Sequence, residues 1–544
     1  MSQKAVSDIV DELEWKVTNI ADEEDITVIE ENGKQKLKFA DRNYEPLNDS
    51  GKGYKILRKN IQTIGGVRKN ILTQDMINEP NTIYEIRYDF DLNGKSINIK
   101  SGCTLDFKGG SFSNGEIQGN STIINSYPTL IFNNVTLLEN FNSQAAYPEW
   151  FGAIADNSSI DNTDSINKCL SYFNKCCLLN GLYYVDHKDN NTNIILVPEG
   201  KILTSTKRQY GYSLMSPKKV GIALREGAVC KYVIEMATGS EVSNIYIIAN
   251  SNVSGLRAKG SRMNIEAVTV INADTGINIE AFLVTLKSVH AAICNTGFKV
   301  TGNYSGDTIS SENTSITLMD CYAADCKDAG YHLISIIYSN LINCACDNTG
   351  LNRFDKNTFK ASYYLVRCSS VNLLGCGSEH GIKLLHCEFC NNSIINIKYI
   401  ANYKEIVEKD KNFYSQYVYT KYISLCNINI YGEFYQKSSD AETIFVYLFD
   451  YDRETVNILN CKSNEIKFEC SGNVSDTINM IKRNTILLNS AVELHKSLIF
   501  KGSTSLRPLL TSSDGGFEYY DTTLKKYIVW NGTEWTNMDG TNLI

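Results

Sequence analysis

Between Val242 and Leu385, apolar and polar positions alternate in a pattern that repeats along the chain. A glycine returns in every copy, and an apolar residue follows it directly. The glycines are Gly255, Gly276, Gly297, Gly330, Gly350 and Gly381. The first two intervals are 21 residues each and the fourth is 20, whereas the third and fifth are longer, as if a loop were inserted.

Residues two apart on a strand share a face, so this spacing predicts strands with one buried face. We expect two short strands per copy, hinged at a glycine with positive φ, and we expect Ile277, Val289 and Phe298 to be buried. One coil cannot bury its apolar face alone, but stacked copies can. The period lacks helical spacing and is rich in Asn, Ser, Thr and Gly, which predicts an all-β protein built on a parallel β-helix. A leucine-rich repeat is the competing solenoid, but its Leu and Asn pattern is absent.

The flanking segments differ in texture and suggest further parts. Apolar residues between Val6 and Ile20 recur at helical spacing, which indicates a short helix and possible oligomer seam. Residues 34–81 are polar, and we expect them to be irregular. The expected parts are an N-terminal attachment region (1–81), a small β region or first narrow coils (82–145), the β-helix (146–400), further coils or a β-sandwich (401–504), and an aromatic C-terminal hairpin module (505–544).

The C-terminal module gathers aromatic residues around Asn531-Gly532, a dipeptide typical of two-residue hairpins. These aromatics are Tyr519, Tyr520, Tyr527, Trp530 and Trp535. They can bind the face of a sugar or pack at a trimer axis, and the sequence favours packing.

A short amphipathic helix is expected after Asn162. Ile166, Cys169, Leu170 and Phe173 form one apolar stripe, and Thr163 or Asp164 can cap its start. Such a helix can cover the open end of the first full coil, which otherwise presents unpaired backbone groups. The alternative is an ordinary surface helix between two domains.

Charge and hydropathy exclude several classes of partner. The net charge is −8 and no basic run occurs, so we expect no nucleic acid to bind. No window approaches 18 uninterrupted apolar residues, so we expect no membrane span. The first residues carry acids where a signal peptide needs an apolar core, and we expect no secretion by that route.

The chain has 17 cysteines without the spacing of a disulfide framework. Many lie inside the repeats, where reduced cysteine suits a coil interior as a small apolar residue. Cys344-Ala-Cys346 and His386-Cys387 lack the spacing of zinc ligands, so we expect neither a metal nor a cofactor.

Carboxylates offer the one candidate chemistry, since no nucleophile elbow, phosphate loop or HExxH motif occurs. The column two positions before each glycine contains Asp328 and Glu379, with Asp325 and His380 close by. Two coils at a spacing of about 4.8 Å would separate the two acids by about 9.6 Å. This approaches the separation of about 6.5–9.5 Å in inverting glycosidases.

The alternative for these acids is structural. Asp and Asn occur in turns because their side chains bond nearby backbone amides. Asn295 and Asn348 fill the same column, which is typical of a structural ladder. The sequence favours this interpretation over catalysis by Asp325, Asp328 or Glu379.

Two segments carry a resemblance to a known family. Phe151-Gly152-Ala153, an Asp/Asn-rich turn and Asn162-Thr163-Asp164-Ser165-Ile166 resemble the opening of pectate-lyase-like β-helices, common in phage tailspikes, although Asn162 stands where that opening usually has Asp. The upstream segments TNIADEED, KLKFADRN and GYKILRKNI resemble the N-terminal part of tail proteins from phages of Bacteroides-type gut bacteria.

The resemblance implies a right-handed parallel β-helix in a virion tail fibre or tailspike. It implies a homotrimer, made in the host cytoplasm, that docks to other tail proteins through its N-terminal region and contacts a host surface glycan or capsule. The alternative function on the same scaffold is a capsular polysaccharide depolymerase, either a glycosidase or a lyase. A host-encoded secreted lyase is disfavoured by the missing signal peptide.

Overall fold

The computed structural model describes most of the chain between residues 26 and 543. The described residues are 26–31, 34–39, 45–46, 53–179, 181–187, 193–206, 219–302, 304–305, 308–309, 314–347, 361–379, 384–402, 418–421, 426–435, 444–449, 455–459, 466–469, 486–487, 501–507, 510, 512 and 515–543. The helix expected before residue 21 lies outside them. The chain divides into two compact units, Met1–Ser143 and Gln144–Ile544.

The first unit consists mainly of short strands. Its elements are β1 (Ile26–Glu31), β2 (Lys34–Phe39), β3 (Glu45–Pro46), β4 (Gly53–Ile56), β5 (Ile61–Ile64), β6 (Val67–Asn70), the 3₁₀ turn η2 (Gln74–Ile77), β7 (Thr82–Ile86), β8 (Phe90–Asp91), β9 (Ser96–Asn98), β10 (Thr104–Phe107), β11 (Phe112–Gln118), β12 (Thr122–Ser126), β13 (Phe132–Leu138) and β14 (Phe141–Asn142). Strands β4, β7, β10, β12 and β14 stack in parallel, and so do β8, β11 and β13. Between these two stacks, the Phe107 ring meets those of Phe112 and Phe132 edge to face, with centroids 5.1 and 5.6 Å away.

The expectation that residues 34–81 are irregular is wrong. Strands β2 to β6 lie in this segment, and β4 pairs in parallel with β7. The segment is polar, so hydrophobic periodicity could not reveal it. Its strands are held instead by main-chain hydrogen bonds, which any sequence can make.

The second unit begins with a helical segment and continues as a long series of strands. The elements as far as β32 are η3 (Pro148–Phe151), α2 (Thr163–Tyr172), β15 (Lys175–Leu178), β16 (Leu182–Val185), β17 (Asn193–Val197), β18 (Ile202–Ser205), β19 (Gly221–Leu224), β20 (Tyr232–Met236), β21 (Glu241–Ser243), β22 (Tyr246–Ile248), β23 (Ser254–Glu266), β24 (Thr269–Ile271), β25 (Thr275–Lys287), β26 (His290–Ala292), β27 (Thr296–Thr301), β28 (Tyr304–Ser305), β29 (Thr308–Ile309), β30 (Thr317–Met319), β31 (Tyr322–Ala324) and β32 (Ala329–Ile334).

The remaining strands continue the series and then change pattern near the C-terminus. They are β33 (Ile337–Ile342), β34 (Ala345–Asp347), β35 (Ala361–Val366), β36 (Ser369–Glu379), β37 (Leu385–Glu388), β38 (Ile394–Asn402), β39 (Val418–Lys421), β40 (Asn427–Tyr435), β41 (Ile444–Phe449), β42 (Thr455–Leu459), β43 (Ile466–Glu469), β44 (Ile486–Leu487), β45 (Lys501–Gly502), β46 (Phe517–Asp521), β47 (Lys526–Trp530) and β48 (Trp535–Asn537), with the 3₁₀ turn η5 (Thr504–Leu506).

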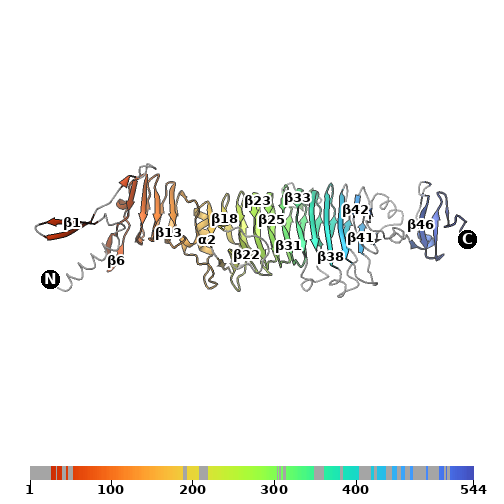
Figure 1. Ribbon diagram of the computed structural model, residues 1–544, viewed down its shortest axis with the longest axis horizontal. Coiled ribbons are helices and arrows are strands. Elements are labelled where there is room, and N and C mark those ends of the chain that lie inside the picture. The colour runs from red at the N-terminus through yellow and green to blue at the C-terminus, as the bar shows by residue number, and fades with distance from the viewer. Residues whose placement is uncertain are drawn as a thin grey trace. The chain divides into compact units, whose positions relative to one another are not determined.

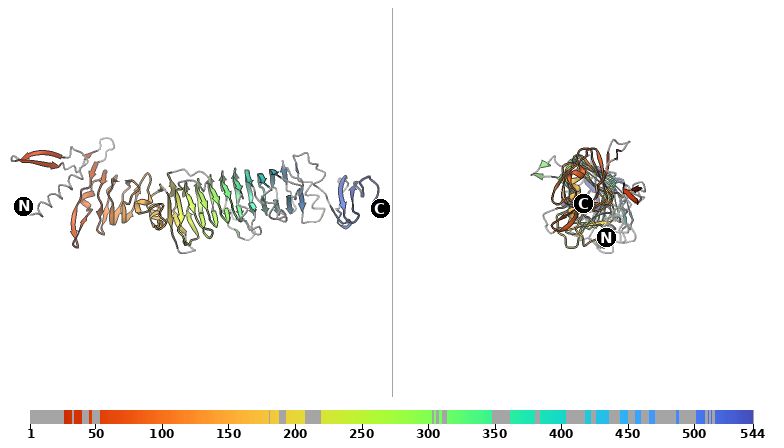
Figure 2. Two further views of the ribbon diagram at one scale, coloured as in Figure 1. Left: turned by 60° about the horizontal axis from the view of Figure 1, so that its bottom comes forward. Right: turned by 90° about the vertical axis from the view of Figure 1, so that its left-hand side faces the viewer.

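Strands β15 to β44, apart from the hairpin β28–β29, form a parallel β-helix (Figures 1 and 2). Each full coil contributes to three faces. Face A begins with β15, β18 and β21, face B with β16, β19 and β22, and face C with β17 and β20. Strand pairing remains parallel as far as Leu487, so the described strands after residue 401 form further coils.

The expectation of two strands per copy is therefore wrong. Strands β23 and β25 have 13 residues each and bend from face C to face A without a loop. Because apolar alternation does not stop at such a bend, the sequence pattern merges two strands into one.

Single residues in the left-handed conformation make the bends. Asn244, Ala267, Ser288, Asp320 and Asn343 have φ of 51–58° between faces A and B. The bend from C to A has its own column with φ of 47–60°, namely Arg262, Leu283, Ser315, Tyr338, Ser370 and Asn392. Asn, Asp and Ser tolerate this conformation better than Leu or Tyr, whose positions are held by the ladders on either side.

The repeated glycines are not these hinges, contrary to the sequence-based expectation. Gly255, Gly276, Gly297 and Gly330 lie at the start of face C strands and have no positive φ. Each is required by close approach: a Cβ on Gly276 would lie 2.7 Å from Ala291 Cβ and 2.7 Å from Gly297 O. The glycine column therefore marks a crowded corner where no side chain fits.

The strand register also changes the alignment of the last two copies of the sequence repeat. Tyr331 pairs with Tyr363, so Ser362 takes the place that the pattern gave to Gly350. Tyr363 pairs with Leu385, so Leu384 takes the place of Gly381. The hydroxyl oxygens of Ser362 and Ser378 are 3.1 Å apart, and both side chains are buried. In earlier coils a glycine stands at the position of Ser362, and the side chain opposite it fills the corner.

The core of the β-helix is apolar and stacked. Ile277, Val289 and Phe298 are all fully buried, as the pattern predicts. Phe298 stacks on Tyr331 with ring centroids 4.9 Å apart, and Tyr331 stacks on Tyr363 at 5.2 Å. Like side chains thus lie over one another at the coil spacing, which extends dispersion contacts along the axis.

Helix α2 packs at the beginning of the β-helix, beside β15 and β17 (Figure 1). The side chains of its residues Ile166, Cys169 and Leu170 are buried, as expected. The helix begins at Thr163, and its first turn is capped from outside: Asp161 Oδ1 accepts from Thr163 N at 2.9 Å. The N-cap position itself is Asn162, which makes no side-chain capping bond, so the expected cap at Thr163 or Asp164 is wrong.

Every described cysteine is buried and none forms a disulfide, while Cys461 and Cys470 lie outside the described residues. One interior column of the β-helix consists of Val289 followed by Cys321, Cys344 and Cys376. Backbone hydrogen bonds between successive coils align these positions. Burial raises the pKa of Cys294 and of Cys346 to about 12, so both remain thiols. Cysteine here replaces valine as a small core residue.

A separate four-stranded sheet, β45 to β48, ends the described chain. Strands β47 and β48 are joined by a four-residue loop, closed by a bond from Asn531 N to Glu534 O at 3.0 Å, rather than by a two-residue turn. Trp530 and Trp535 pack against each other at 5.7 Å across this hairpin.

Candidate functional site

Asp328 lies in a structural ladder at the bend between faces B and C. Backbone hydrogen bonds between consecutive coils place Val253, Asp274, Asn295 and Asp328 one above the other. Asn295 Nδ2 donates to Asp274 Oδ1 at 2.8 Å, and Thr296 Oγ1 donates to Asp328 Oδ2 at 3.3 Å. The first four members of the column expected from the sequence do stack.

Glu379 belongs to a different column. It pairs with Asp347 on face B, and Asp347 pairs with Ala324. The register therefore does not place Asp328 and Glu379 two coils apart in one ladder, and the separation inferred from that arrangement no longer follows. The error follows from the register, because Leu384 holds the position equivalent to Gly330 where the sequence pattern expects a glycine.

The structure instead brings Asp325 and Glu379 to the same neighbour, Asp347. Asp325 N donates to Asp347 O at 2.9 Å, and Glu379 N donates to Asp347 Oδ1 at 3.1 Å. Tyr322 Oη donates to the other oxygen, Asp347 Oδ2, at 2.7 Å. Asp325 has φ of 52°, which makes it one of the left-handed bend residues. Burial and the neighbouring Asp347 carboxylate raise the pKa of Tyr322.

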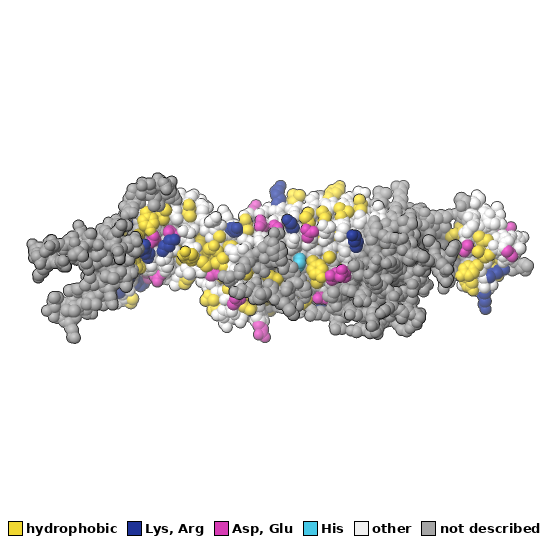
Figure 3. All heavy atoms as spheres, in the orientation of Figure 1, with side chains coloured by type: hydrophobic (Ala, Val, Ile, Leu, Met, Phe, Trp, Pro, Cys, Tyr) yellow, Lys and Arg dark blue, Asp and Glu magenta, His cyan; other side chains and the backbone are white. Residues whose placement is uncertain are grey.

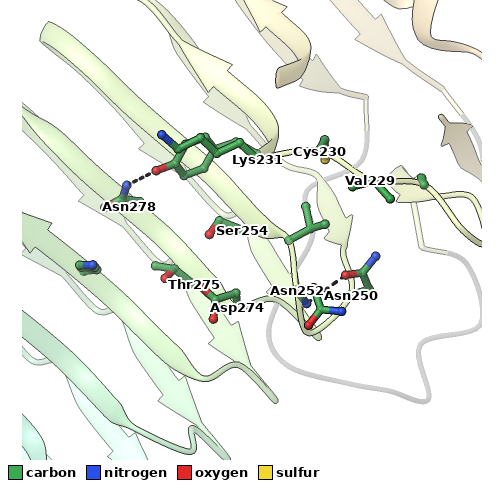
Figure 4. A pocket seen from close by; sticks show the side chains of 13 residues that line it. Val229, Cys230, Lys231, Asn250, Asn252, Ser254, Asp274, Thr275 and Asn278 are labelled. Atoms are coloured by element: carbon green, nitrogen blue, oxygen red, sulfur yellow. Dashed lines mark hydrogen bonds between the residues drawn. The ribbon is translucent and has the colours of Figure 1, made fainter. Parts of the chain in front are cut away.

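A polar pocket of about 620 Å³ opens on face C beside the ladder that holds Asp274 (Figure 4). Its lining comes from consecutive coils of face C and from the bends that precede them. The lining residues are Ala228, Val229, Cys230, Lys231, Tyr232, Asn250, Asn252, Val253, Ser254, Asp274, Thr275, Asn278 and Lys299. A volume of this size falls in the range of small-ligand sites.

A network of buried and half-buried polar groups supports the pocket from one side. Arg257 donates to Glu235 Oε2 at 2.9 Å and to Glu280 Oε2. Asn278 Nδ2 donates to Glu280 Oε1 at 2.7 Å and to Tyr232 Oη at 2.8 Å (Figure 4). Burial alone would raise the pKa of Glu280, but the hydrogen bonds from Arg257 and Asn278 outweigh it and lower that pKa. Glu280 is therefore ionised and poorly suited to act as a general acid.

A second cavity of about 690 Å³ adjoins the first and shares Asn250 with it. Its other lining residues are Ala249, Ser251, Asn272, Ile293, Asn295 and Lys327. The second cavity is lined by residues of the bends between faces B and C, whereas the first extends from these bends along face C, so amide and lysine side chains surround this corner.

Sequence reasoning named Asp274 as a ladder residue but missed the pocket. Asn278, Tyr232 and Glu280 carry no motif, because strand pairing alone brings residues 46 positions apart into contact. The one available signal was the run of outward-facing polar residues on face C strands, at Arg257, Asn278 and Lys299.

Charged side chains of both signs occur on the surface, and no metal site is evident in the described part of the chain. On the face shown in Figure 3, acidic side chains are interspersed with lysine and arginine. Within the described ranges, no group of three or more His, Cys, Asp or Glu residues has the arrangement of a metal site. None of the described helices is long and apolar enough to span a membrane.

No family model and no curated protein matches the chain. Among solved structures, the tailspike gp42 of Acinetobacter phage vb_AbaP_AS12 is 17% identical over 77% of this chain and 68% of that chain, with a TM-score of 0.38. The enzymatically active domain of tailspike protein 2 of Bacteriophage CBA120 is 12% identical over 66% of this chain, with a TM-score of 0.35. ORF18 of Geobacillus virus E2 is 10% identical over 60% of this chain, with a TM-score of 0.36. This chain spans 47% and 58% of the last two, and likenesses at this level assign no activity to it.

Proposed function

We propose that this protein is a phage tail fibre or tailspike that adsorbs to a glycan on the host cell envelope. The observation that carries the proposal is the polar, ligand-sized pocket on the outer face of a β-helix whose first coil is covered by α2. Asn, Thr, Ser, Tyr and Lys side chains supply both donors and acceptors there, which suits a polyhydroxylated ligand.

The covering segment also carries the sequence resemblance. Phe151, Gly152 and Ala153 lie at and just after the end of η3, and Ser165 Oγ in α2 donates to Phe151 O at 2.9 Å. The residues that resemble the opening of tailspike β-helices are thus the residues that close the end of the coil stack. This agreement between motif and structural role supports the proposed class.

The finer parts of the proposal concern assembly. The N-terminal region (residues 1–81) attaches the protein to other tail proteins, and three copies associate as a homotrimer. The support is the sequence resemblance, together with exposed apolar side chains on the β-helix such as Leu283, which is 44% exposed, and Tyr338, which is 65% exposed.

Immunoelectron microscopy of the virion tests the proposal directly. Antibodies raised against the purified protein are expected to label the tail of the phage that encodes it. Label confined to the capsid, or found on lysed host cells and absent from particles, would contradict a tail component.

A capsular depolymerase on the same scaffold is the second candidate function. Asp325, Asp347 and Glu379 lie together at one bend, and this gathering of carboxylates is the observation that favours it. The purified protein would be incubated with capsular polysaccharides from candidate hosts. New reducing ends or unsaturated uronates would establish catalysis, whereas their absence across hosts that the protein adsorbs to would leave adsorption as the function.

A further inference from the structure

One amide in the pocket has a fixed orientation. Asn278 is 5% exposed, and its Nδ2 donates to both Tyr232 Oη and Glu280 Oε1. An ionised carboxylate only accepts hydrogen bonds, so the amide nitrogen must face Glu280. Both N–H groups of Asn278 are thereby used. Its carbonyl oxygen is buried and has no hydrogen-bond partner among the described residues.

Arg257 and Glu280 act as positioning residues for this amide. Arg257 holds Glu280 by one arm of its guanidinium and Glu235 by the other. Rotation of Asn278 by 180° would turn its oxygen toward the Glu280 carboxylate and replace the bond to Glu280 by a contact between two acceptors. Asn278 lines the pocket, so the network keeps a residue with an unpaired acceptor at its wall.

The unpaired oxygen defines the chemistry of the ligand. A buried acceptor without a partner costs free energy that a donor can recover, so the ligand must bring an O–H or N–H group. An ionised carboxylate, phosphate or sulfate group has no such hydrogen at neutral pH. The charged residues that line the pocket are Lys231, Lys299 and Asp274, and the adjoining group of Arg257, Glu235 and Glu280 adds one negative charge that offsets the excess positive charge of the lining.

We propose that this pocket binds an uncharged sugar unit of the surface polysaccharide, with one sugar hydroxyl donating to Asn278 Oδ1. The inference rests on the proposed function, since it names the part of the host glycan that is recognised. Thr275 and Ser254 line the same pocket and can donate to further sugar oxygens, and Lys231 and Lys299 can donate from its two ends.

The test uses the full-length protein and envelope polysaccharide from a bacterium to which the labelled protein adsorbs. Affinity is measured by calorimetry for the native polysaccharide and for the same material after chemical reduction of its carboxyl groups. We expect the two affinities to agree within about twofold, because no anionic group is recognised. Asn278→Ala is expected to weaken binding by about 10-fold or more.

Asn372→Ala is the matched control. Asn372 also lies in a ladder, where its Nδ2 donates to Asn340 Oδ1 at 3.0 Å, but it is on face A and does not line the pocket. This variant is expected to bind as the wild type does. If Asn278→Ala melts at a lower temperature, hydrogen exchange on the wild type replaces it, and added polysaccharide should slow exchange at the backbone amides of Thr275 and Lys299.

Three results would overturn the inference: loss of binding on carboxyl reduction, wild-type affinity in folded Asn278→Ala, or unchanged exchange at the pocket when the polysaccharide is bound. Each of these leaves adsorption itself intact. Failure of the wild-type protein to adsorb to any bacterium that the phage infects would instead contradict the proposed function, so the two failures are distinguishable.

Discussion

At the scale of single residues, stacked columns decide what each position tolerates. Phe298 has no exposed surface and stacks between coils on Tyr331, whereas Phe282, on the neighbouring strand, is 36% exposed. The same residue type therefore contributes very differently to stability at two positions that lie one coil apart.

Phe298→Ala is expected to reduce the free energy of unfolding by about 3–5 kcal/mol, because the deleted ring leaves a cavity under Tyr331. Phe282→Ala serves as control and should change it by less than about 1 kcal/mol, since the ring already meets solvent. Urea denaturation followed by circular dichroism measures both. Equal midpoints for Phe298→Ala and wild type would show that the ring is not in the core.

Asp328→Asn and Glu379→Gln are expected to fold normally and to leave host binding intact. The ladder needs only a side-chain oxygen at Asp328, and Asn295 already fills an equivalent position. Glu379 lies outside this ladder, and its backbone N–H, which Gln keeps, donates to Asp347 Oδ1. A general acid or nucleophile needs an ionisable carboxyl group, which the amides lack. On a host lawn, a wild-type halo that either folded variant fails to produce would assign catalysis to that acid.

Residue patterns in the sequence predicted the fold better than the site. The columns of Ile277, Val289 and Phe298 were predictable because burial repeats with each coil. The strand register beyond Gly330 was not predictable from the sequence. There Ser362 replaces the glycine and Ser378 lies opposite it, and such a paired change between residues far apart in sequence leaves no local pattern. The pocket depends on contacts such as Tyr232 with Asn278, which leave no local pattern.

At the scale of elements, the segment that covers the first coil contains an unusual carboxyl group. Glu149, in η3, accepts a hydrogen bond from Tyr183 Oη, while its Oε2 is buried without a partner among the described residues. Burial raises the pKa of Glu149 above its ordinary value of 4.5, although the bond from Tyr183 opposes the shift. The folded chain therefore holds this proton more tightly than the unfolded chain does.

This raised pKa predicts a pH dependence of stability with a definite sign. The contribution of Glu149 is fully present below pH 4.5 and is lost as the pH rises through the higher folded-state pKa. Glu149→Gln keeps an acceptor for Tyr183 and cannot ionise. Its melting temperature minus that of the wild type should therefore increase between about pH 4 and pH 8. A difference that stays constant over this range would show that Glu149 has an ordinary pKa in the folded protein.

At the scale of the whole molecule, the proposal requires self-association. The β-helix leaves Leu283 and Tyr338 exposed in one column of bends between faces C and A, two coils apart, where a partner surface can cover them. Light scattering after size exclusion is expected to give about three times the chain mass of 60.9 kDa. A mass of one chain at every concentration tested would contradict the trimer.

The central claim is that this β-helix binds a glycan of the host envelope, and competition for adsorption tests it most directly. Host cells would be saturated with purified protein, with Asn372→Ala and with Asn278→Ala before phage is added, and free phage would then be counted. The account predicts that wild type and Asn372→Ala block adsorption, that Asn278→Ala blocks it only at about 10-fold higher concentration, and that cells stripped of surface polysaccharide bind none of the three. Undiminished phage adsorption on cells saturated with the wild-type protein would contradict the account.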